Sequence, residues 1–261
     1  KWDLQMVAIE QNGEKEKTEK SGRSGALPWI GEGMYKMNWT APKGYKRAVL
    51  VFDGAMSQPV VTVNGKEAGK WAYGYNAFRI DITPFIQFGK KNLIEVHLNN
   101  VEESSRWYPG GGLYRPVSVE LYGNENFSTW DTFVRTLKAD KQEAEVEVNA
   151  LLEGKTGKSG KTVIALLDEA GKKVAEQTVS GATPVVKTTL KVANPQLWSP
   201  ESPYLYQVKL TRYEGKKVAD VQTLKTGIRT ISVSKEYGFQ LNGVTRKLKG
   251  VCLHHDLGPL G

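Results

Sequence analysis

The chain has 261 residues, 36 of them Lys or Arg and 28 Asp or Glu, for a formal net charge of +8. With 39% hydrophobic and 25% charged residues, it can form the packed core of one large or two ordinary domains, so global disorder is excluded. The basic residues are spread over Gly-rich turns, which disfavours a nucleic-acid partner, and no apolar run approaches the roughly 20 residues of a membrane helix.

Short strands separated by turns dominate the first part of the chain. Asn64-Gly65 follows a β-branched run, which is a strong hairpin signal. Residues 92–100 alternate in polarity, so that Ile94, Val96 and Leu98 are predicted to face a core. Further strands are predicted within residues 47–54, 59–69 and 116–123.

A second group of strands follows residues 123–129, which are polar and have the composition of a linker. About seven strands in roughly 105 residues is the density expected of an immunoglobulin-like sandwich. The disulfide of antibody domains is absent because Cys252 is the chain's one cysteine, so burial alone must stabilise this sandwich. Trp198 is expected to pack against it.

A third piece begins near Tyr237. It is predicted to form a hairpin that turns at Asn242-Gly243, followed by a short apolar strand over 250–253 and a loop to the end. Cys252 would then be an inert core residue of that strand. At about 25 residues this piece is too short to be a domain.

The chain resembles the N-terminal part of glycoside hydrolase family 2, the β-galactosidase-like enzymes. The resemblance implies a jelly-roll sugar-binding domain over 1–124, an immunoglobulin-like β-sandwich over 125–232, and the opening hairpin and first strand of a (β/α)₈ barrel over 233–261. The fold expected of this chain is therefore all-β. The motifs that support the resemblance span residues 50–70, 73–83, 105–117, 194–206, 226–231 and 238–261.

The family's chemistry is retaining hydrolysis, which needs two carboxylates about 5–5.5 Å apart. By resemblance both come from later barrel strands, so we expect no catalytic residue here and no hydrolysis by this segment alone. Asn124-Glu125 has the order of the family's acid/base motif but lies in the expected linker. Glu102-Glu103 is expected to lie in a loop, where neighbouring side chains on extended backbone would point apart.

Five residues are candidates for contact with the sugar. By resemblance His254 and Asp256 follow the first barrel strand, at the barrel's active-site face; a metal site or an exposed loop is the alternative. Arg106 and Trp107 lie in a Gly-rich loop, where a ring can stack on a pyranose and a guanidinium can bind hydroxyls. The alternative is a structural role, in which the aromatic residues of that loop pack the sandwich against the barrel. Asn100 is the fifth candidate, although a turn-forming role is favoured for Asn-Asn.

Other polar and aromatic residues have simpler interpretations. Residues 72–81 carry exposed-looking aromatics that suit a sugar-stacking platform, whereas Phe78 and Ile80 are expected in the core. Arg115 is expected to pair structurally with a carboxylate, and His97 to be an ordinary surface residue. No cofactor is predicted, and a structural cation is left open.

The parent protein is expected to hydrolyse a terminal β-galactoside, with β-glucuronides and β-mannosides as alternatives within the family. A free-standing carbohydrate-binding module and a purely structural module are the competing functions. The expected partner is a carbohydrate, with no nucleic acid and no membrane. A homo-oligomer through the sandwiches or through residues 248–260 is left open as a further partner.

Overall fold

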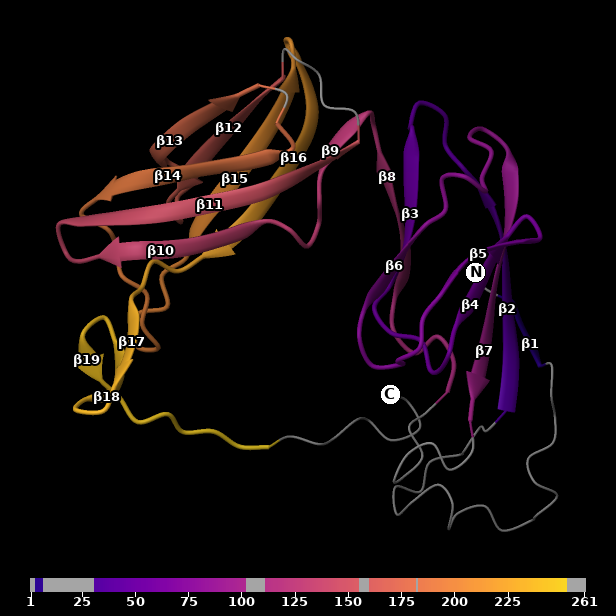
Figure 1. The fold of residues 1–261 in the computed structure, drawn as a ribbon, viewed down its shortest axis with the longest axis horizontal. Coiled ribbons are helices and arrows are strands. Elements are labelled where there is room, and N and C mark those ends of the chain that lie inside the picture. Colours follow the sequence, from indigo (N-terminus) through magenta and orange to yellow (C-terminus); the bar gives the residue numbers. More distant parts are fainter. Residues whose placement is uncertain (1–2, 7–30, 102–110, 155–159, 182, 253–261) are drawn as a thin grey trace. The chain divides into compact units, whose positions relative to one another are not determined.

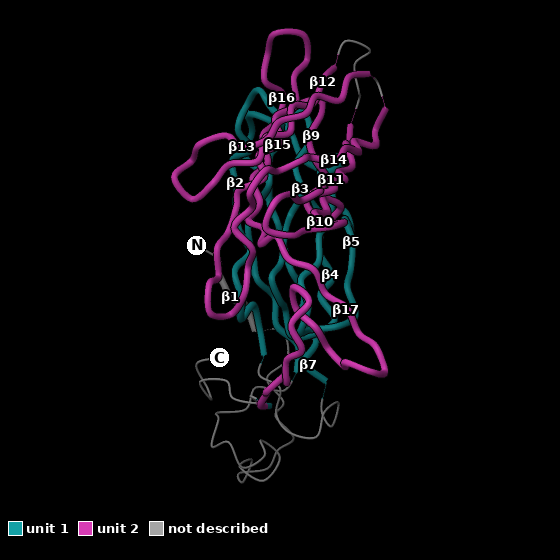
Figure 2. The backbone as a smooth tube through the Cα atoms, turned by 90° about the vertical axis from the view of Figure 1, so that its left-hand side faces the viewer, with its two compact units in different colours: residues 1–122, 252–261 teal, residues 123–251 magenta. Residues whose placement is uncertain are grey.

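The computed structural model describes residues 3–6, 31–101, 111–154, 160–181 and 183–252. Within these ranges the chain is all-β, as the sequence predicts (Figure 1). The described residues form no helix, and hence none that could cross a membrane. The chain divides into two compact units, residues 1–122 with 252–261 and residues 123–251 (Figure 2).

The first unit contains two antiparallel sheets. One has five strands in the order β1-β2-β7-β4-β5, and the other has three in the order β6-β3-β8. The strands are β1 (Asp3–Met6), β2 (Gly31–Thr40), β3 (Arg47–Phe52), β4 (Val60–Val63), β5 (Lys66–Lys70), β6 (Phe78–Asp81), β7 (Lys91–Asn100) and β8 (Val117–Tyr122).

The core of the first unit lies between these sheets. Ile94, Val96 and Leu98 of β7 are buried, which confirms the core face predicted from their alternation. They pack in one cluster with Phe52 of β3 and Val61 of β4, among others. Burial of each such side chain contributes about 1.5–3 kcal/mol, so the two-residue period of the sequence specifies which face of β7 turns inward.

The β4–β5 hairpin forms where the Asn-Gly pair predicts it. Asn64 and Gly65 have φ angles of 51° and 78°, the left-handed conformation that a tight hairpin turn requires. The Asn64 side chain also donates to the Phe85 carbonyl and to the Asn92 Oδ1 atom, at 2.8 and 2.9 Å. The turn is therefore fixed both locally and from the neighbouring loop.

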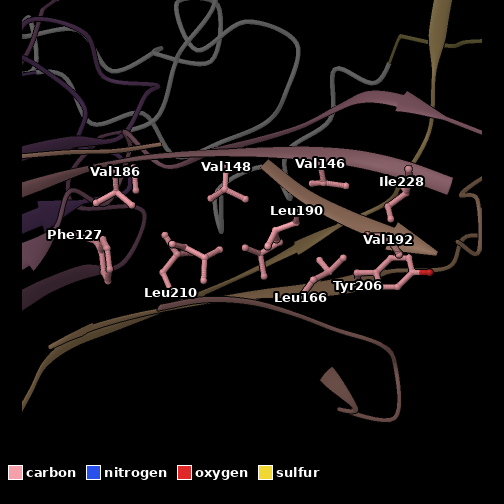
Figure 3. Packing of buried hydrophobic residues seen from close by; sticks show 14 of the residues in the cluster. Phe127, Val146, Val148, Leu166, Val186, Leu190, Val192, Tyr206, Leu210 and Ile228 are labelled. Atoms are coloured by element: carbon pink, nitrogen blue, oxygen red, sulfur yellow. The ribbon is translucent and has the colours of Figure 1, made fainter. Parts of the chain in front are cut away.

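The second unit is a sandwich of two antiparallel sheets, ordered β10-β11-β14 and β13-β12-β15-β16, with β9 pairing an extension of β11. Its buried residues, including Phe127, Leu166, Leu190 and Leu210, fill the space between the sheets (Figure 3). The strands are β9 (Glu125–Phe127), β10 (Phe133–Ala139), β11 (Glu143–Gly154), β12 (Gly160–Leu167), β13 (Lys173–Ser180), β14 (Val185–Ala193), β15 (Tyr206–Glu214) and β16 (Lys217–Thr226).

The expected linker over residues 123–129 is wrong. Residues 125–127 form β9, whose three residues are all buried and pair with β11. Polar composition misleads here because the polar groups have buried partners: the Glu125 carboxylate accepts two hydrogen bonds from Arg212, at 2.8 and 3.0 Å. Glu125 is thus held in an ion pair inside the second sandwich.

A small three-stranded sheet ends the described part of the chain: β17 (Ile231–Ser234), β18 (Gly238–Leu241) and β19 (Val244–Thr245). The turn at Asn242-Gly243, with φ angles of 52° and 76°, confirms the predicted hairpin. The apolar strand expected next does not form at residues 250–252, and Leu253 lies outside the described residues. Val251 is 96% exposed and Cys252 is exposed, so the prediction of a core cysteine is wrong: none of the strands that the structure describes covers it.

Trp198 packs within the second unit, as expected. Its backbone N–H donates to Ile228, and the Arg229 guanidinium lies 5.0 Å from its ring centroid. A Cβ on Gly227 would meet ring and Cβ atoms of Trp198 at 2.7–2.8 Å, so this contact needs a glycine. The Trp198 carbonyl accepts from Asn242, which ties the small sheet to the sandwich within this unit.

Candidate functional site

Four of the five predicted sugar contacts lie outside the described residues: Arg106, Trp107, His254 and Asp256. Asn100 is described, as are both segments that flank residues 102–110. The site can therefore be described through the two stems that flank residues 102–110, which are residues 99–101 and 111–115, and through the segments of the first unit that hold them.

Asn100 is the last residue of β7, where it pairs with Gly31 of β2. It is 2% exposed and lies on the same parity as the core residues of β7. The turn-forming role favoured for Asn99-Asn100 is therefore wrong, since the ladder with β2 continues through both residues. Asn100 brings a buried amide directly to the start of the loop.

One short segment holds both stems of the loop. Asn99 donates its N–H to the Ser57 carbonyl at 2.9 Å, and the Ser57 hydroxyl donates to the Asn99 carbonyl at 2.6 Å. On the other stem, Met56 and Gly112 exchange two backbone hydrogen bonds of 3.0 and 2.9 Å. Consecutive residues thus fix the residues that precede and follow 102–110, which is the rigid support that a binding loop needs.

Gly112 is required at its position in the second stem. Its φ of 96° lies in the region that favours glycine, and a Cβ there would overlap the Tyr35 hydroxyl. For Gly112, the group that approaches closely is a side chain of β2 in the same unit.

The residues after Gly112 connect the loop to residues 71–77. The Tyr114 hydroxyl donates to the Gly74 carbonyl at 2.9 Å, and Arg115 Nη1 donates to the Tyr75 carbonyl at 3.0 Å and to the Asp53 carbonyl at 3.3 Å. The predicted structural role of Arg115 is thus supported. Its described partners are two backbone carbonyls and the Tyr114 ring, instead of the expected carboxylate.

His97 has a partner that its sequence neighbourhood does not reveal. Its Nε2 lies 3.2 Å from Glu32 Oε2, because β2 and β7 are adjacent strands. The side chain is 29% exposed, so the prediction of an ordinary surface residue needs correction to a half-buried residue paired with a carboxylate. His97 therefore contributes to sheet pairing on the polar face of β7.

The arrangement is suited to binding and positioning. Among the described residues no group of three His, Cys, Asp or Glu side chains could hold a metal ion. The sequence points to residues 102–110, whose predicted loop lies outside the described residues, and gives no sign of the Met56-Ser57 support. Two residues shortly after Asp53-Gly54 carry no signal of contact with segments about 42 and 56 positions away.

Comparison with known proteins finds one family and several relatives to which the chain is similar. The model of the glycosyl hydrolases family 2 matches residues 128–229. A provisionally named β-glucuronidase of Formosa agariphila is 37% identical over 265 residues, covering 100% of this chain and 25% of the relative. A β-galactosidase of Bacteroides ovatus is 35% identical over 264 residues, covering 97% of this chain and 31% of the relative.

Solved structures agree. The crystal structure of a glycosyl hydrolase family 2 member from Bacteroides cellulosilyticus superposes with a TM-score of 0.80 at 37% identity, covering 88% of this chain and 31% of that one. The chain thus spans about a quarter to a third of the length of the curated relatives and of the structure named here.

Proposed function

We propose that this chain, which belongs to family 2 of the glycosyl hydrolases, is the non-catalytic N-terminal portion of a retaining β-glycosidase. The observation that carries the proposal is the match of nearly the whole chain to only part of much longer relatives, among them a β-galactosidase and a provisionally named β-glucuronidase. In this proposal the two sandwiches support a sugar site that a catalytic barrel completes. The modules are those expected from the sequence, with boundaries near residues 124 and 232.

The substrate proposed first is a terminal β-galactoside. The name of the Bacteroides ovatus relative favours it. A β-glucuronide is the second candidate, because the name of the Formosa agariphila relative favours it at similar identity. The intact polypeptide that contains residues 1–261 distinguishes them when kcat/KM is measured with nitrophenyl β-galactoside and nitrophenyl β-glucuronide. A galactosidase prefers the first by more than about tenfold, which is about 1.4 kcal/mol of transition-state binding.

The sugar contacts proposed for this chain are Asn100, Arg106, Trp107, His254 and Asp256. The described stems support the part played by residues 102–110, since Asn99 and Gly112 are fixed by the Met56-Ser57 segment. A loop whose ends are held in this way can place a guanidinium and an indole ring against a sugar with little loss of entropy on binding.

Substitutions in the intact polypeptide test these contacts. Arg106→Ala and Trp107→Ala are each expected to raise KM for the preferred nitrophenyl glycoside by about tenfold or more. Lys172→Ala, in an exposed turn of the second unit, is the control and should leave KM unchanged. If KM is unaltered in both loop variants, the loop does not contact the sugar, and the first two modules are structural.

A further inference from the structure

We propose that residues 71–77 of the first unit form a second contact surface for carbohydrate, in which Trp71, Tyr73 and Tyr75 stack on the pyranose rings of an oligosaccharide. This proposal rests on the proposed function in naming carbohydrate as the ligand. It goes beyond that function by assigning a binding surface to residues outside the five proposed sugar contacts.

Three aromatic side chains of this segment are exposed within only five positions. Trp71 is 40% exposed, Tyr73 59% and Tyr75 41%, while Gly74 between the tyrosines is buried. The Tyr73 and Tyr75 rings lie 5.6 Å apart at 55° to each other. Exposed aromatic rings that gather in this way mark binding surfaces. A ligand that covers them removes their apolar surface from water, which is favourable.

Trp71 is the outer member of a stack of three rings that begins in the core. Phe52 stacks on Phe78 with centroids 4.6 Å apart, and Trp71 stacks on Phe78 at 5.6 Å with the planes only 9° apart. Phe52 and Phe78 are fully buried, so they hold the indole plane in one orientation. A ligand ring that packs on Trp71 meets a surface already ordered before binding.

The backbone of the segment is fixed from three directions. Trp71 donates its N–H to the Pro59 carbonyl at 3.0 Å, and the Gly74 and Tyr75 carbonyls accept from Tyr114 and Arg115. A Cβ on Gly74 would meet the Met56 sulfur at 2.5 Å, so the chain passes close to the side chain of the residue that also supports the 102–110 stem. Such support keeps the two tyrosines exposed instead of allowing collapse onto the core.

Hydrogen-bonding groups border the aromatic rings. Asn76 accepts from the Trp71 indole N–H at 2.9 Å, which leaves its own amide N–H donors without an acceptor among the described residues. Asp53 and Arg115 are exposed beside Tyr75 and bring charges of both signs. Flat rings bordered by an amide, a carboxylate and a guanidinium match the apolar faces and hydroxyl rim of a neutral pyranose.

The segment differs from the exposed aliphatic residues of β17 and of the chain after β19, such as Val233 at 76% and Val251 at 96%. Residues 71–77 expose three aromatic rings together and no aliphatic side chain larger than Ala72. Flat rings bordered by hydrogen-bonding groups suit stacking on pyranose rings, so the occupant proposed is an oligosaccharide.

Isothermal titration of residues 1–261 with β-1,4-linked galactotetraose and cellotetraose tests the proposal. Saturable binding is expected for at least one of the two. Tyr73→Ala and Trp71→Ala are expected to weaken it by about fivefold to tenfold each, as the loss of one stacked ring implies. Tyr73 carries the decisive result, because its ring is the most exposed of the three and its removal leaves the core stack intact.

Two exposed aromatic residues of the second unit serve as matched controls. Trp130, 60% exposed, and Tyr237, 63% exposed, should tolerate substitution by Ala with unchanged affinity. No binding of either tetrasaccharide, or equal binding by wild type and Tyr73→Ala, overturns the proposal. Failure of the intact polypeptide to hydrolyse nitrophenyl glycosides would instead remove the proposed function, and the titration would still decide whether this surface binds sugar.

Discussion

Glu125 and Arg212 form an ion pair in the second unit that is almost completely removed from solvent, with 2% and 1% exposure of the side chains. Arg212 also donates to the Thr162 hydroxyl and the Gly181 carbonyl, at 3.4 and 3.3 Å. Removal of one partner leaves a buried charge without its counterion. Glu125→Ala is therefore expected to lower the free energy of unfolding by about 3–5 kcal/mol, measured by urea denaturation.

An exposed pair provides the comparison. Glu143 is 57% exposed and lies 2.6 Å from Lys138. Glu143→Ala is expected to change the free energy of unfolding by about 1 kcal/mol or less, because water screens the charges. Equal effects of Glu125→Ala and Glu143→Ala would contradict the structural role assigned to the buried pair.

A second ion pair gives a pH-dependent contribution to stability. The hydrogen bond from Arg246, with an Nη1–Oε1 distance of 2.5 Å, lowers the pKa of Glu201 from 4.5 to about 2. Because the folded pKa is the lower one, the contribution is complete above pH 4.5 and is lost as the pH falls towards 2. NMR titration of the Glu201 carboxyl should show this low pKa, and Arg246→Ala should raise it towards 4.5, because the remaining hydrogen bonds, one of them with Ser199, also lower it. An unchanged pKa in that variant would contradict the pairing.

At the residue scale, the sequence correctly predicts the roles of residues that depend on their immediate neighbours in the chain. Asn64-Gly65 and Asn242-Gly243 both turn as expected, since a type of residue and its backbone angle decide the turn. The predicted environments of His97 and Glu125 are wrong because their partners are distant in sequence. Glu32 lies 65 positions from His97, and Arg212 lies 87 positions from Glu125. Side-chain pairing across such separations follows from strand order, which one sequence does not display.

Among the elements, β9 depends on a glycine at the end of its partner strand. Gly154 of β11 has a φ of 93°, and a Cβ there would overlap the Asn124 carbonyl oxygen. Backbone cannot yield as a flexible side chain can, so Gly154→Ala should force β9 away from β11. We expect it to lower the free energy of unfolding by about 2 kcal/mol more than a glycine substitution without this clash.

Gly215 is the matched control. It also has a positive φ, of 60°, but nothing lies within 4 Å of the position that a Cβ would take there. Gly215→Ala therefore carries the backbone strain of the left-handed conformation, about 1–2 kcal/mol, without the steric conflict. Denaturation midpoints of the two variants separate the effects, and equal midpoints would show that β9 does not need this close approach.

Elements with strict alternation were predictable, and elements stabilised by distant partners were not. The inward face of β7 follows from its sequence because a shift by one residue would reverse every side chain. β9 has three residues and no such pattern, and it forms because β11 extends to meet it. The strand expected at residues 250–253 has the right composition, yet none of the described strands pairs with residues 250–252.

At the scale of the whole molecule, strand density predicts an immunoglobulin-like sandwich in the second part of the chain, and the family resemblance implies another sandwich before it; the described residues are all-β and form paired sheets in both units. The proposed function rests on ordered motifs over most of the chain and on the family match, since no cluster among the described residues by itself specifies a reaction. The contacts that hold the two stems and the segment 71–77 could be seen only in the structure. They join segments that are far apart in the sequence, and the sequence alone does not show such contacts.

The most direct test of the account is the hydrolysis of nitrophenyl β-galactoside and nitrophenyl β-glucuronide by two purified proteins, the polypeptide of residues 1–261 and the intact polypeptide that contains it. The intact polypeptide should turn over one of the two substrates, and residues 1–261 should show no rate above buffer. Turnover by residues 1–261, surviving repurification to constant specific activity, would contradict the proposal that these sandwiches position a sugar without cleaving its bond.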